Sequence, residues 1–446
     1  MARRFRRRTR PARTRVVRGV TAIAATLAVT LAQAPAAAAP DGPRSAVPPR
    51  AAHGPAGAPF DPAKLRATLD AAHDAGTYGL FSSVRDGRVR WEGASGVADV
   101  RTERPVTAGM RQRVGGITMT FLATAILQQV EKERIDLDAP VNRYLPGLIP
   151  GEPGEQTTVR MLLNHTSGIG DYIASAFPSL TELSPESLDA RRFRRLPPEQ
   201  LVKWGLKAPR TGIPGERWSY SNTNYVIAGL ILEKVTGTRA EEYISRNVIA
   251  EAGLRDTYFP SSAWVFGPHP RMYESLYQRV DPPRDYSVYD MSWAWTAGAL
   301  VSTPRDLNRF YRALLTGELI GDEALVQMKR AVAVEDEEGD FLLNYGLGLY
   351  AISLPCGTFW GHDGSVFGAA AQSLSTEDGS RQMSIALNLT RYQQLDAEGN
   401  PAPHPIDNAL GAYIVEALCG GRAAPTSAGA DRPVRPLPLR SAGARP

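Results

Sequence analysis

The stretch Arg113-Val114-Gly115-Gly116-Ile117-Thr118-Met119-Thr120-Phe121 opens the part of the chain that is most informative about the fold. After it, apolar residues recur at i, i+3 and i+4 steps, at Phe121, Leu122, Ala125, Ile126 and Val130. That spacing is typical of a helix with one buried face, so the sequence predicts a helix over Thr118–Glu133. Two adjacent glycines stand just before this helix.

Strand patterns lie on both sides of this helix, towards the two ends of the chain. Strands are predicted at Tyr78–Val84 and Val89–Trp91, around the turn Arg85-Asp86-Gly87, and later at Leu342–Ser353, Gly368–Ser375 and Met383–Leu389. Further helices are predicted at Leu65–Ala75, Val159–Leu163, Pro198–Leu206, Tyr225–Thr236, Arg239–Ile249, Asp306–Leu315 and Asp407–Leu418. This order predicts a sheet completed by both ends of the chain, with a helical subdomain at roughly residues 120–300. The fold class is α/β, or α+β by stricter labels.

The formal net charge of +5 is distributed unevenly along the 446 residues. Residues 1–39 hold nine arginines and no acidic residue, residues 40–59 two arginines and one aspartate, and the last 27 residues five arginines and one aspartate. The remaining body, residues 60–419, therefore carries −9. A nucleic-acid surface needs clustered positive charge on the folded body, so we expect no nucleic-acid partner.

The first 39 residues have the pattern of a secretory signal peptide. Arginines up to Arg18 precede an apolar run from Val20 to Ala32 and a small-residue stretch that ends at Ala39. The run is shorter than the roughly 20 residues that cross a bilayer as a helix. We expect cleavage near Ala39 and a secreted, extracellular or cell-wall-associated protein with no membrane span; an uncleaved anchor is the alternative. Residues 40–59 are predicted to be a flexible linker and residues 420–446 a disordered tail.

The two cysteines, Cys356 and Cys419, are predicted to form a disulfide, because an exported chain folds in an oxidising compartment. The six histidines show no spacing typical of metal ligands, so no metal site and no cofactor is expected.

Two further segments form a series of three sequence motifs together with Arg113–Phe121. They are Tyr220-Ser221-Asn222 and Trp360-Gly361-His362-Asp363-Gly364. Their order and spacing resemble those of the serine DD-peptidases (D-alanyl-D-alanine carboxypeptidases) and class C β-lactamases. The resemblance covers nearly all of residues 60–419 and includes Leu163-Asn164-His165-Thr166-Ser167-Gly168. It implies a half with an antiparallel sheet flanked by helices, an all-helical half, and an active site in the cleft between them.

The resemblance also implies acyl-transfer chemistry, but the first motif is broken. In that family a Ser-x-x-Lys motif opens a helix, so that the nucleophile and the lysine share one face. Here Gly116 stands at the serine position and Met119 at the lysine position. Glycine has no side chain to acylate and methionine cannot carry a proton. None of the six lysines, at 64, 132, 203, 207, 234 and 329, has a serine three residues before it.

The other two motifs match the family residue by residue. Tyr220 and His362 take catalytic positions, while Asn222, Asp363 and Gly364 take substrate-binding positions. Asp363 stands where DD-peptidases usually have Thr or Ser, and its carboxylate would repel the terminal carboxylate of a D-Ala-D-Ala peptide.

Two functions follow from this pattern. The first is a monomeric binding or regulatory pseudoenzyme that holds a peptide or a cell-wall-like small ligand. The second is a working hydrolase or acyl transferase on peptide, amide or ester substrates, in which Tyr220 and His362 act on water. Thr118, Thr120 and the neighbouring pair His165 and Ser167 carry groups that could replace the nucleophile, but we expect them to pack the helix or brace the loop.

Overall fold

The computed structural model describes residues 29–30, 60–335, 341–397, 399–420 and 435–436. The predicted linker lies outside these residues. So do the predicted signal peptide, apart from β1 (Val29–Thr30), and the predicted tail, apart from Gly420 and β16 (Arg435–Pro436). β1 and β16 pair with each other as a two-stranded antiparallel ladder.

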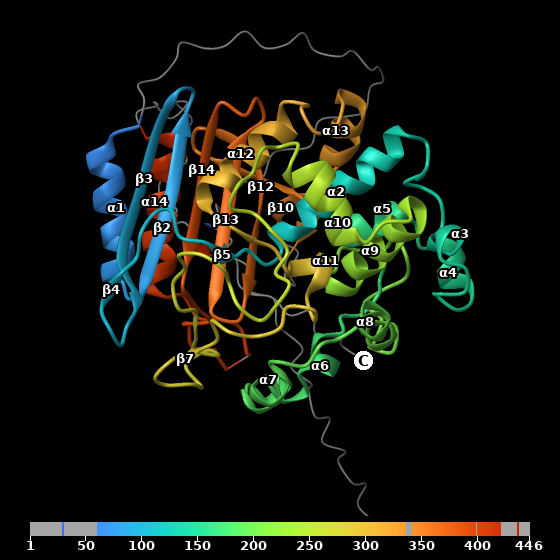
Figure 1. Cartoon of the computed structure of the whole chain (residues 1–446), viewed down its shortest axis with the longest axis horizontal. Helices are drawn as coiled ribbons and strands as arrows, with labels where there is room; N and C mark the ends of the chain where they lie inside the picture. The colour runs from blue at the N-terminus through green and yellow to red at the C-terminus, as the bar shows by residue number, and fades with distance from the viewer. Residues whose placement is uncertain (1–28, 31–59, 336–340, 398, 421–434, 437–446) are drawn as a thin grey trace, which may run out of the picture.

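A nine-stranded antiparallel sheet forms one half of the described fold (Figure 1). In spatial order its strands are β4 (Arg104–Pro105), β3 (Val89–Asp99), β2 (Gly79–Asp86), β14 (Arg381–Leu387), β13 (Ala369–Thr376), β12 (Gly357–Val366), β11 (Tyr350–Leu354), β10 (Phe341–Tyr345) and β9 (Val332–Glu335). β2 pairs with β14, with Phe81 opposite Ala386. The N-terminal hairpin therefore completes the sheet of the C-terminal strands, as the sequence predicts.

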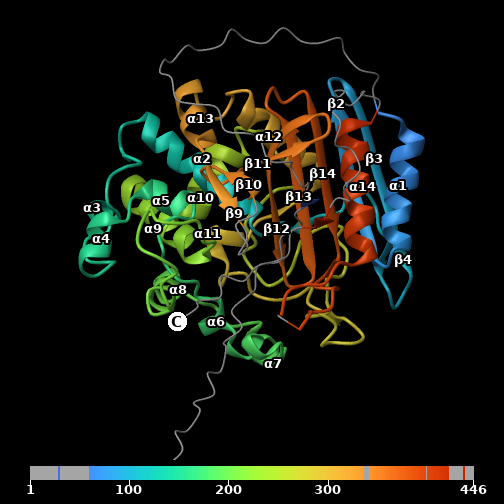
Figure 2. The ribbon, with the colours of Figure 1, turned by 180° about the vertical axis from the view of Figure 1, so that it is seen from behind.

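Helices cover both faces of this sheet. α1 (Pro62–Asp74) packs on α14 (Pro405–Cys419) across one face, and α12 (Pro304–Leu315) packs on β2, β13 and β14. Figure 2 shows α14 in front of the strands, on the side of the sheet that is turned away in Figure 1, with α1 beside it at the edge of the sheet. Every residue of β14 is buried, which is the pattern of a strand covered on both faces.

The helix-rich half lies between two short strands, β5 (Gln112–Arg113) and β8 (Val301–Ser302), which pair with each other. Its helices are α2 (Ile117–Glu131), α3 (Val141–Tyr144), α4 (Glu152–Gln156), α5 (Val159–Leu163), α6 (Ile173–Ala176), a 3-10 helix (Pro178–Glu182), α7 (Glu186–Arg191), α8 (Pro198–Gly205), α9 (Asn222–Thr236), α10 (Ala240–Ile244), a π-helical turn (Ser245–Ile249) and α11 (Trp295–Gly298). α2 is buried on nearly all sides, so it is the central helix of this half.

The remaining elements are α13 (Asp322–Lys329) and a small sheet of β6 (Tyr273–Glu274), β7 (Arg284–Asp285) and β15 (Leu389–Thr390). Two predictions need correction. The single strand predicted at Leu342–Ser353 is the hairpin of β10 and β11, which turns at Gly346 and Gly348. The helix predicted at Arg239–Ile249 is α10 followed by the π-helical turn.

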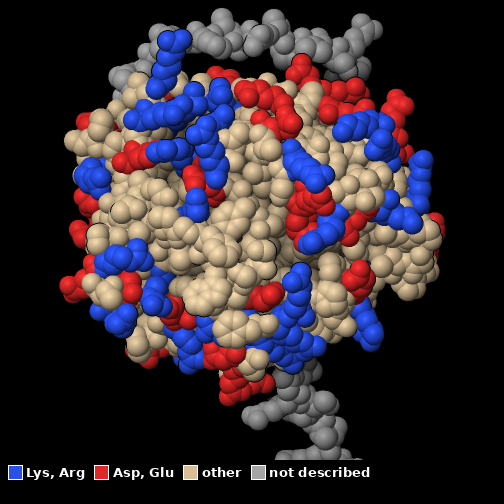
Figure 3. Space-filling view, viewed as in Figure 1, with Lys and Arg blue, Asp and Glu red and all other residues tan. Residues whose placement is uncertain are grey.

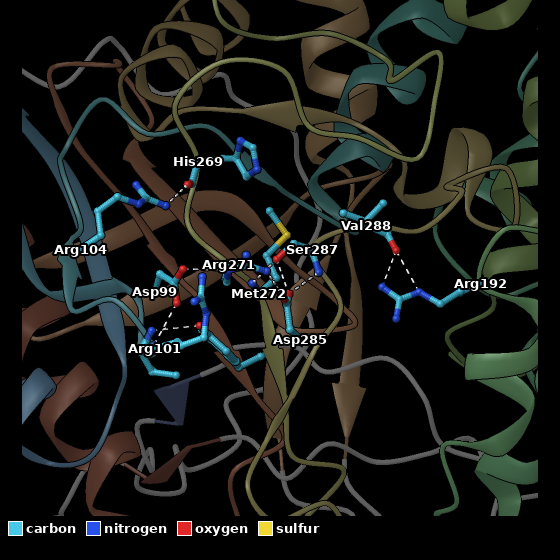
Figure 4. Close-up of polar contacts among 12 residues, drawn as sticks. Asp99, Arg101, Arg104, Arg192, His269, Arg271, Met272, Asp285, Ser287 and Val288 are labelled. Atoms are coloured by element: carbon cyan, nitrogen blue, oxygen red, sulfur yellow. Dashed lines mark hydrogen bonds and ion pairs between the residues drawn. The ribbon is translucent and has the colours of Figure 1, made fainter.

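The segment that runs from His269 through β6 to α11 is held in place by hydrogen bonds and ion pairs of arginines (Figure 4). Arg271 donates to Asp99 at 2.9 Å and also pairs with Asp285, and Arg104 donates to the carbonyl of His269 at 2.9 Å. Arg192, which follows α7 in the helical half, donates a hydrogen bond to the carbonyl of Val288. These contacts hold the segment that leads into α11 against both halves of the fold.

The predicted disulfide is present between Cys356 and Cys419, with the two Cα atoms 5.4 Å apart. Cys356 lies in the turn between β11 and β12, and Cys419 is the last residue of α14. The bond therefore ties the end of the folded body to the strand that carries His362, as the sequence predicts.

Charged side chains are mixed in sign on the face shown in Figure 3, where Lys and Arg alternate with Asp and Glu around a largely uncharged centre. Of the helices in the described ranges, none combines the length and apolar character needed to cross a bilayer.

Candidate active site

The three motifs meet at Gly116, which immediately precedes α2. A Cβ atom built on Gly116 would lie 3.0 Å from the carbonyl oxygen of Asp363, 3.2 Å from Cε1 of His362 and 3.4 Å from the hydroxyl of Tyr220. The structure therefore brings together residues that are separated by more than a hundred positions in the sequence. The point at which they converge carries no side chain.

Two glycines permit this close approach of β12 to the start of α2. Gly115 has φ +53°, and a Cβ there would lie 2.5 Å from the backbone nitrogen of Ser365. A Cβ on Gly364 would lie 2.1 Å from the carbonyl oxygen of Val114 and 2.3 Å from the nitrogen of Gly116. Any larger residue would push the strand and the helix apart, so Gly364 acts through the backbone rather than by a side-chain contact.

Met119 is fully buried in the first turn of α2, where its N–H donates to the carbonyl of Gly116 at 2.8 Å. Its side chain belongs to the apolar core of the helical half. Thr118 accepts a hydrogen bond from the N–H of Leu300, and Thr120 donates to the carbonyl of Gly348. Both threonines therefore brace α2 in the core, as the sequence analysis favours.

His362 is 1% exposed, and both of its ring nitrogens have partners. Nε2 lies 2.8 Å from the hydroxyl of Tyr345, and Nδ1 contacts the carbonyl of Asp363. Because a carbonyl can only accept, the partners assign the proton to Nδ1 and make Tyr345 the donor to Nε2. Burial lowers the pKa of His362 to about 4. The imidazole is therefore neutral at pH 7.

Tyr220 is half-buried, and its hydroxyl points towards Gly116. Burial raises the pKa of Tyr220 well above 10, and Tyr345, Asp171 and Asp363 raise it further. A tyrosine in this environment keeps its proton at neutral pH and is a poor general base.

Asn222 is the first residue of α9 and is oriented by Asp171. Oδ2 of Asp171 accepts the backbone N–H of Asn222 at 2.9 Å and its side-chain amide at 2.8 Å. The other amide atom, Oδ1, faces the hydroxyl of Tyr220 at 3.4 Å. Asp171 carries no signal in the sequence, because it lies 51 positions before Asn222 in a loop with no motif of its own.

Asp363 is only 2% exposed, which differs from the expectation that its carboxylate faces a ligand. Burial raises the pKa of Asp363 well above its usual value, against a hydrogen bond with Tyr350 that lowers it. Its Oδ2 has no hydrogen-bond partner among the described residues. Burial favours the neutral acid, so the predicted repulsion of a terminal carboxylate loses its physical basis.

His165 and Ser167 lie beside the site but do not form a nucleophile–base pair. Ser167 donates to the side chain of Asn224 at 2.6 Å, and Nδ1 of His165 faces the amide of the same Asn224 at 3.2 Å. The ring of His165 packs against Tyr220 and Tyr345, with centroids 4.6 Å and 5.1 Å away. His165 therefore supports the aromatic wall of the site.

The described residues contain no group of three or more His, Cys, Asp or Glu side chains placed to hold a metal ion. The arrangement of Tyr220, Asn222 and His362 around the first turn of a buried helix, between a sheet and a helical half, defines the class of penicillin-recognising serine hydrolases. The chain belongs to the Beta-lactamase family, whose family model matches residues 65–387.

Several known proteins are similar to this chain. The structure of a D-stereospecific amidohydrolase from Streptomyces sp. has a TM-score of 0.70 at 36% identity and covers 81% of this chain and 99% of its own. Esterase EstB of Burkholderia gladioli is 30% identical over 46% of this chain and 54% of its own length. A D-aminopeptidase of Brucella anthropi is 29% identical over 43% of this chain and 34% of its own length. The chain thus matches only about a third to a half of these two curated relatives.

Proposed function

We propose that this protein is a binding or regulatory member of the Beta-lactamase family that cannot form an acyl-enzyme. The observation that carries the proposal is the convergence of Asp363, Tyr220 and His362 on Gly116. A covalent mechanism places its nucleophile at that point, and glycine offers none.

The surrounding groups also lack a proton acceptor that works at neutral pH. Met119 cannot take a proton, and the pKa of Tyr220 is raised well above 10 by burial, Tyr345 and the nearby carboxyls. His362 is neutral, but its Nε2 is already hydrogen-bonded to Tyr345. The alternative function, in which Tyr220 and His362 activate water, would need the phenolate of Tyr220 or a free imidazole nitrogen. The environment opposes both.

We propose an amide of a D-amino acid, alone or at the end of a short cell-wall-like peptide, as the ligand. Two of the relatives are named for chemistry on D-configured compounds, a D-stereospecific amidohydrolase and a D-aminopeptidase. The side chains that would hold such a ligand, Tyr220 and Asn222, are retained at the site.

Export and a monomeric state are part of the same proposal. The disulfide between Cys356 and Cys419 supports export, because such bonds persist in oxidising compartments. Size-exclusion chromatography with light scattering would test the monomeric state, and N-terminal sequencing of the protein from culture medium would test cleavage near Ala39.

The proposed function is tested with the purified protein and two kinds of reagent. A fluorescent penicillin, which labels by acylation, should give no covalent label. D-phenylalanine amide should bind in titration calorimetry and should be recovered unhydrolysed. Stoichiometric labelling, or turnover of the amide above the uncatalysed rate, would overturn the pseudoenzyme proposal. If D-phenylalanine amide, D-phenylalanine methyl ester and free D-phenylalanine all failed to bind, the proposed ligand class would be wrong.

A further inference from the structure

Asp171 restricts the orientation of the Asn222 side chain more strongly than any other group near the site. Its Oδ2 accepts two hydrogen bonds from Asn222, and its Oδ1 accepts the N–H of Ile173 at 2.9 Å. Burial raises the pKa of Asp171, but its two oxygens already accept three N–H groups, so the amide nitrogen of Asn222 faces Asp171 as a donor. The amide oxygen is therefore turned the other way.

That oxygen faces the hydroxyl of Tyr220, which itself lies next to Gly116. The hydroxyl of Tyr220 lies 3.4 Å from Oδ1 of Asn222 and 3.4 Å from the position of a Cβ on Gly116. The carbonyl oxygen of Asp363 lies 3.0 Å from the same position. The acceptors near this position are therefore the carbonyl of Asp363 and Oδ1 of Asn222, and the Tyr220 hydroxyl donates to the second of them.

Among the described residues, the side-chain hydrogen-bond partners of these two oxygens are the Tyr220 hydroxyl and the His362 ring, and no lysine or arginine donates to them. In the described part of the chain, no lysine or arginine is among the groups that shift the pKa of Tyr220, Asp171, His362 or Asp363. Met119 occupies the position at which the family has a lysine. A site with acceptors and without a cation favours ligands that donate hydrogen bonds over ligands that only accept them.

We propose that Asp171 is a positioning residue that, by fixing the amide of Asn222, makes the site select the N–H of a D-amino acid amide over the corresponding ester or carboxylate. The inference rests on the proposed function, since it concerns the ligand of the same site. An ester places an oxygen opposite Oδ1 of Asn222, which leaves two acceptors facing each other. Loss of one hydrogen bond of this kind weakens binding by about tenfold.

The first experiment compares three ligands that share one side chain, in titration calorimetry with the full-length protein. D-phenylalanine amide is expected to bind about tenfold more tightly than D-phenylalanine methyl ester, and free D-phenylalanine is expected to bind more weakly than the amide. Equal affinity for the amide and the ester, or tighter binding of the ester or of the free acid, would overturn the inference and leave the proposed function standing. Absence of binding by all three ligands would instead count against the proposed function.

The second experiment asks whether Asp171 is responsible for the preference. Asp171→Ala is expected to weaken binding of the amide and to leave the ester nearly unchanged, so that the ratio of the two affinities falls towards one. Asp171→Asn keeps one oxygen for the donors of Asn222 and is expected to retain the preference. Asp74→Ala, at an exposed position at the end of α1, is the matched control.

A purely structural role for Asp171 would give a different result. In that case Asp171→Ala would weaken the amide and the ester by the same factor, and the ratio would stay at its wild-type value. That outcome contradicts the inference. Thermal unfolding of each variant shows whether it is folded, and the comparison of ligands on the wild-type protein stands whether or not Asp171→Ala folds.

Discussion

Two deeply buried polar regions of this protein differ in charge. One is a charged ion pair, and the other consists of neutral groups. Behind the turn between β12 and β13, Arg391 donates to Glu274 at 3.0 Å from Nε, and both side chains are at most 2% exposed. Burial alone would lower the pKa of Arg391, but the Glu274 carboxylate outweighs burial and raises it. At the candidate active site, His362 is equally buried, and its pKa is lowered to about 4.

The difference lies in the counter-charge rather than in the burial. Glu274 also accepts from Thr390 at 2.8 Å and from the N–H of Leu276 at 2.8 Å, so its charge is well compensated. In the described part of the chain, no lysine or arginine contributes to the pKa shifts of His362, Tyr220 and Asp363, and all three are shifted towards their neutral forms. The site therefore brings its motif residues together in their neutral forms, which agrees with the proposal that it forms no acyl-enzyme.

The strongest test of this comparison restores both missing groups. Gly116→Ser with Met119→Lys is expected to become labelled by a fluorescent penicillin, with a rate at least about a thousandfold above the wild type, because nucleophile and base act as a unit. Labelling is measured by gel fluorescence and by the mass of the intact protein. Gly116→Ser alone is the matched control and should remain unlabelled.

A double variant that folds and does not label would show that the site has lost more than two side chains. The Cβ of a serine at this position would lie only 3.0 Å from the carbonyl of Asp363, so β12 has to yield by a few tenths of an ångström. In that case the retained geometry described above would not be that of a competent site.

The second prediction concerns the buried ion pair of Arg391 and Glu274. Glu274→Ala should lower the free energy of unfolding by about 3–5 kcal/mol, because it leaves the guanidinium of Arg391 buried without a partner. Denaturation by urea measures the change. Glu92→Ala breaks an exposed pair with Arg305, whose N–O distance is 2.7 Å, and should cost less than about 1 kcal/mol. Equal losses in the two variants would contradict the distinction between the regions.

The third prediction follows from the pKa of His362, which is lowered from 6.5 to about 4 in the folded protein. The unfolded chain binds this proton at higher pH than the folded chain does. Stability from this group is therefore complete above pH 6.5 and falls as the pH drops towards 4, by about 3 kcal/mol in total. The unfolding free energy of the wild type, measured between pH 7 and pH 4, should fall more steeply than that of His362→Gln; parallel curves would show that His362 is not buried in its neutral form.

The sequence predicts the N-terminal hairpin, β13, β14 and the central helix well, because they depend on local patterns, whereas β12 is not predicted as a strand. The hairpin of β2 and β3 has strand periodicity and a glycine turn, and α2 has its apolar residues at helical spacing. The convergence of Gly116, Tyr220 and His362 could also be predicted, since each lies in a short motif with fixed order.

The remaining parts of the site depend on contacts between distant loops, and no local pattern encodes them. Asp171 is meaningful only because its loop reaches the start of α9. Tyr345 lies in the hairpin of β10 and β11, which the apolar pattern predicts as one strand, so its hydroxyl could not be placed on His362. Asp363 was expected to face a ligand, whereas the fold buries its carboxyl.

The smallest expected effect comes from the hydroxyl of Tyr345, which bonds His362 at 2.8 Å. Tyr345→Phe should lower the free energy of unfolding by about 1 kcal/mol, the usual net contribution of a hydrogen bond between neutral groups. Tyr78→Phe, at a tyrosine that packs edge-on against Tyr273, is the control and should cost less. If Tyr345→Phe lowered the free energy of unfolding as much as Glu274→Ala does, a buried charge would be present at the site, as it is at the Arg391–Glu274 pair. A loss near 1 kcal/mol is what a site of neutral groups requires, because neutral partners lose one hydrogen bond and leave no buried charge behind.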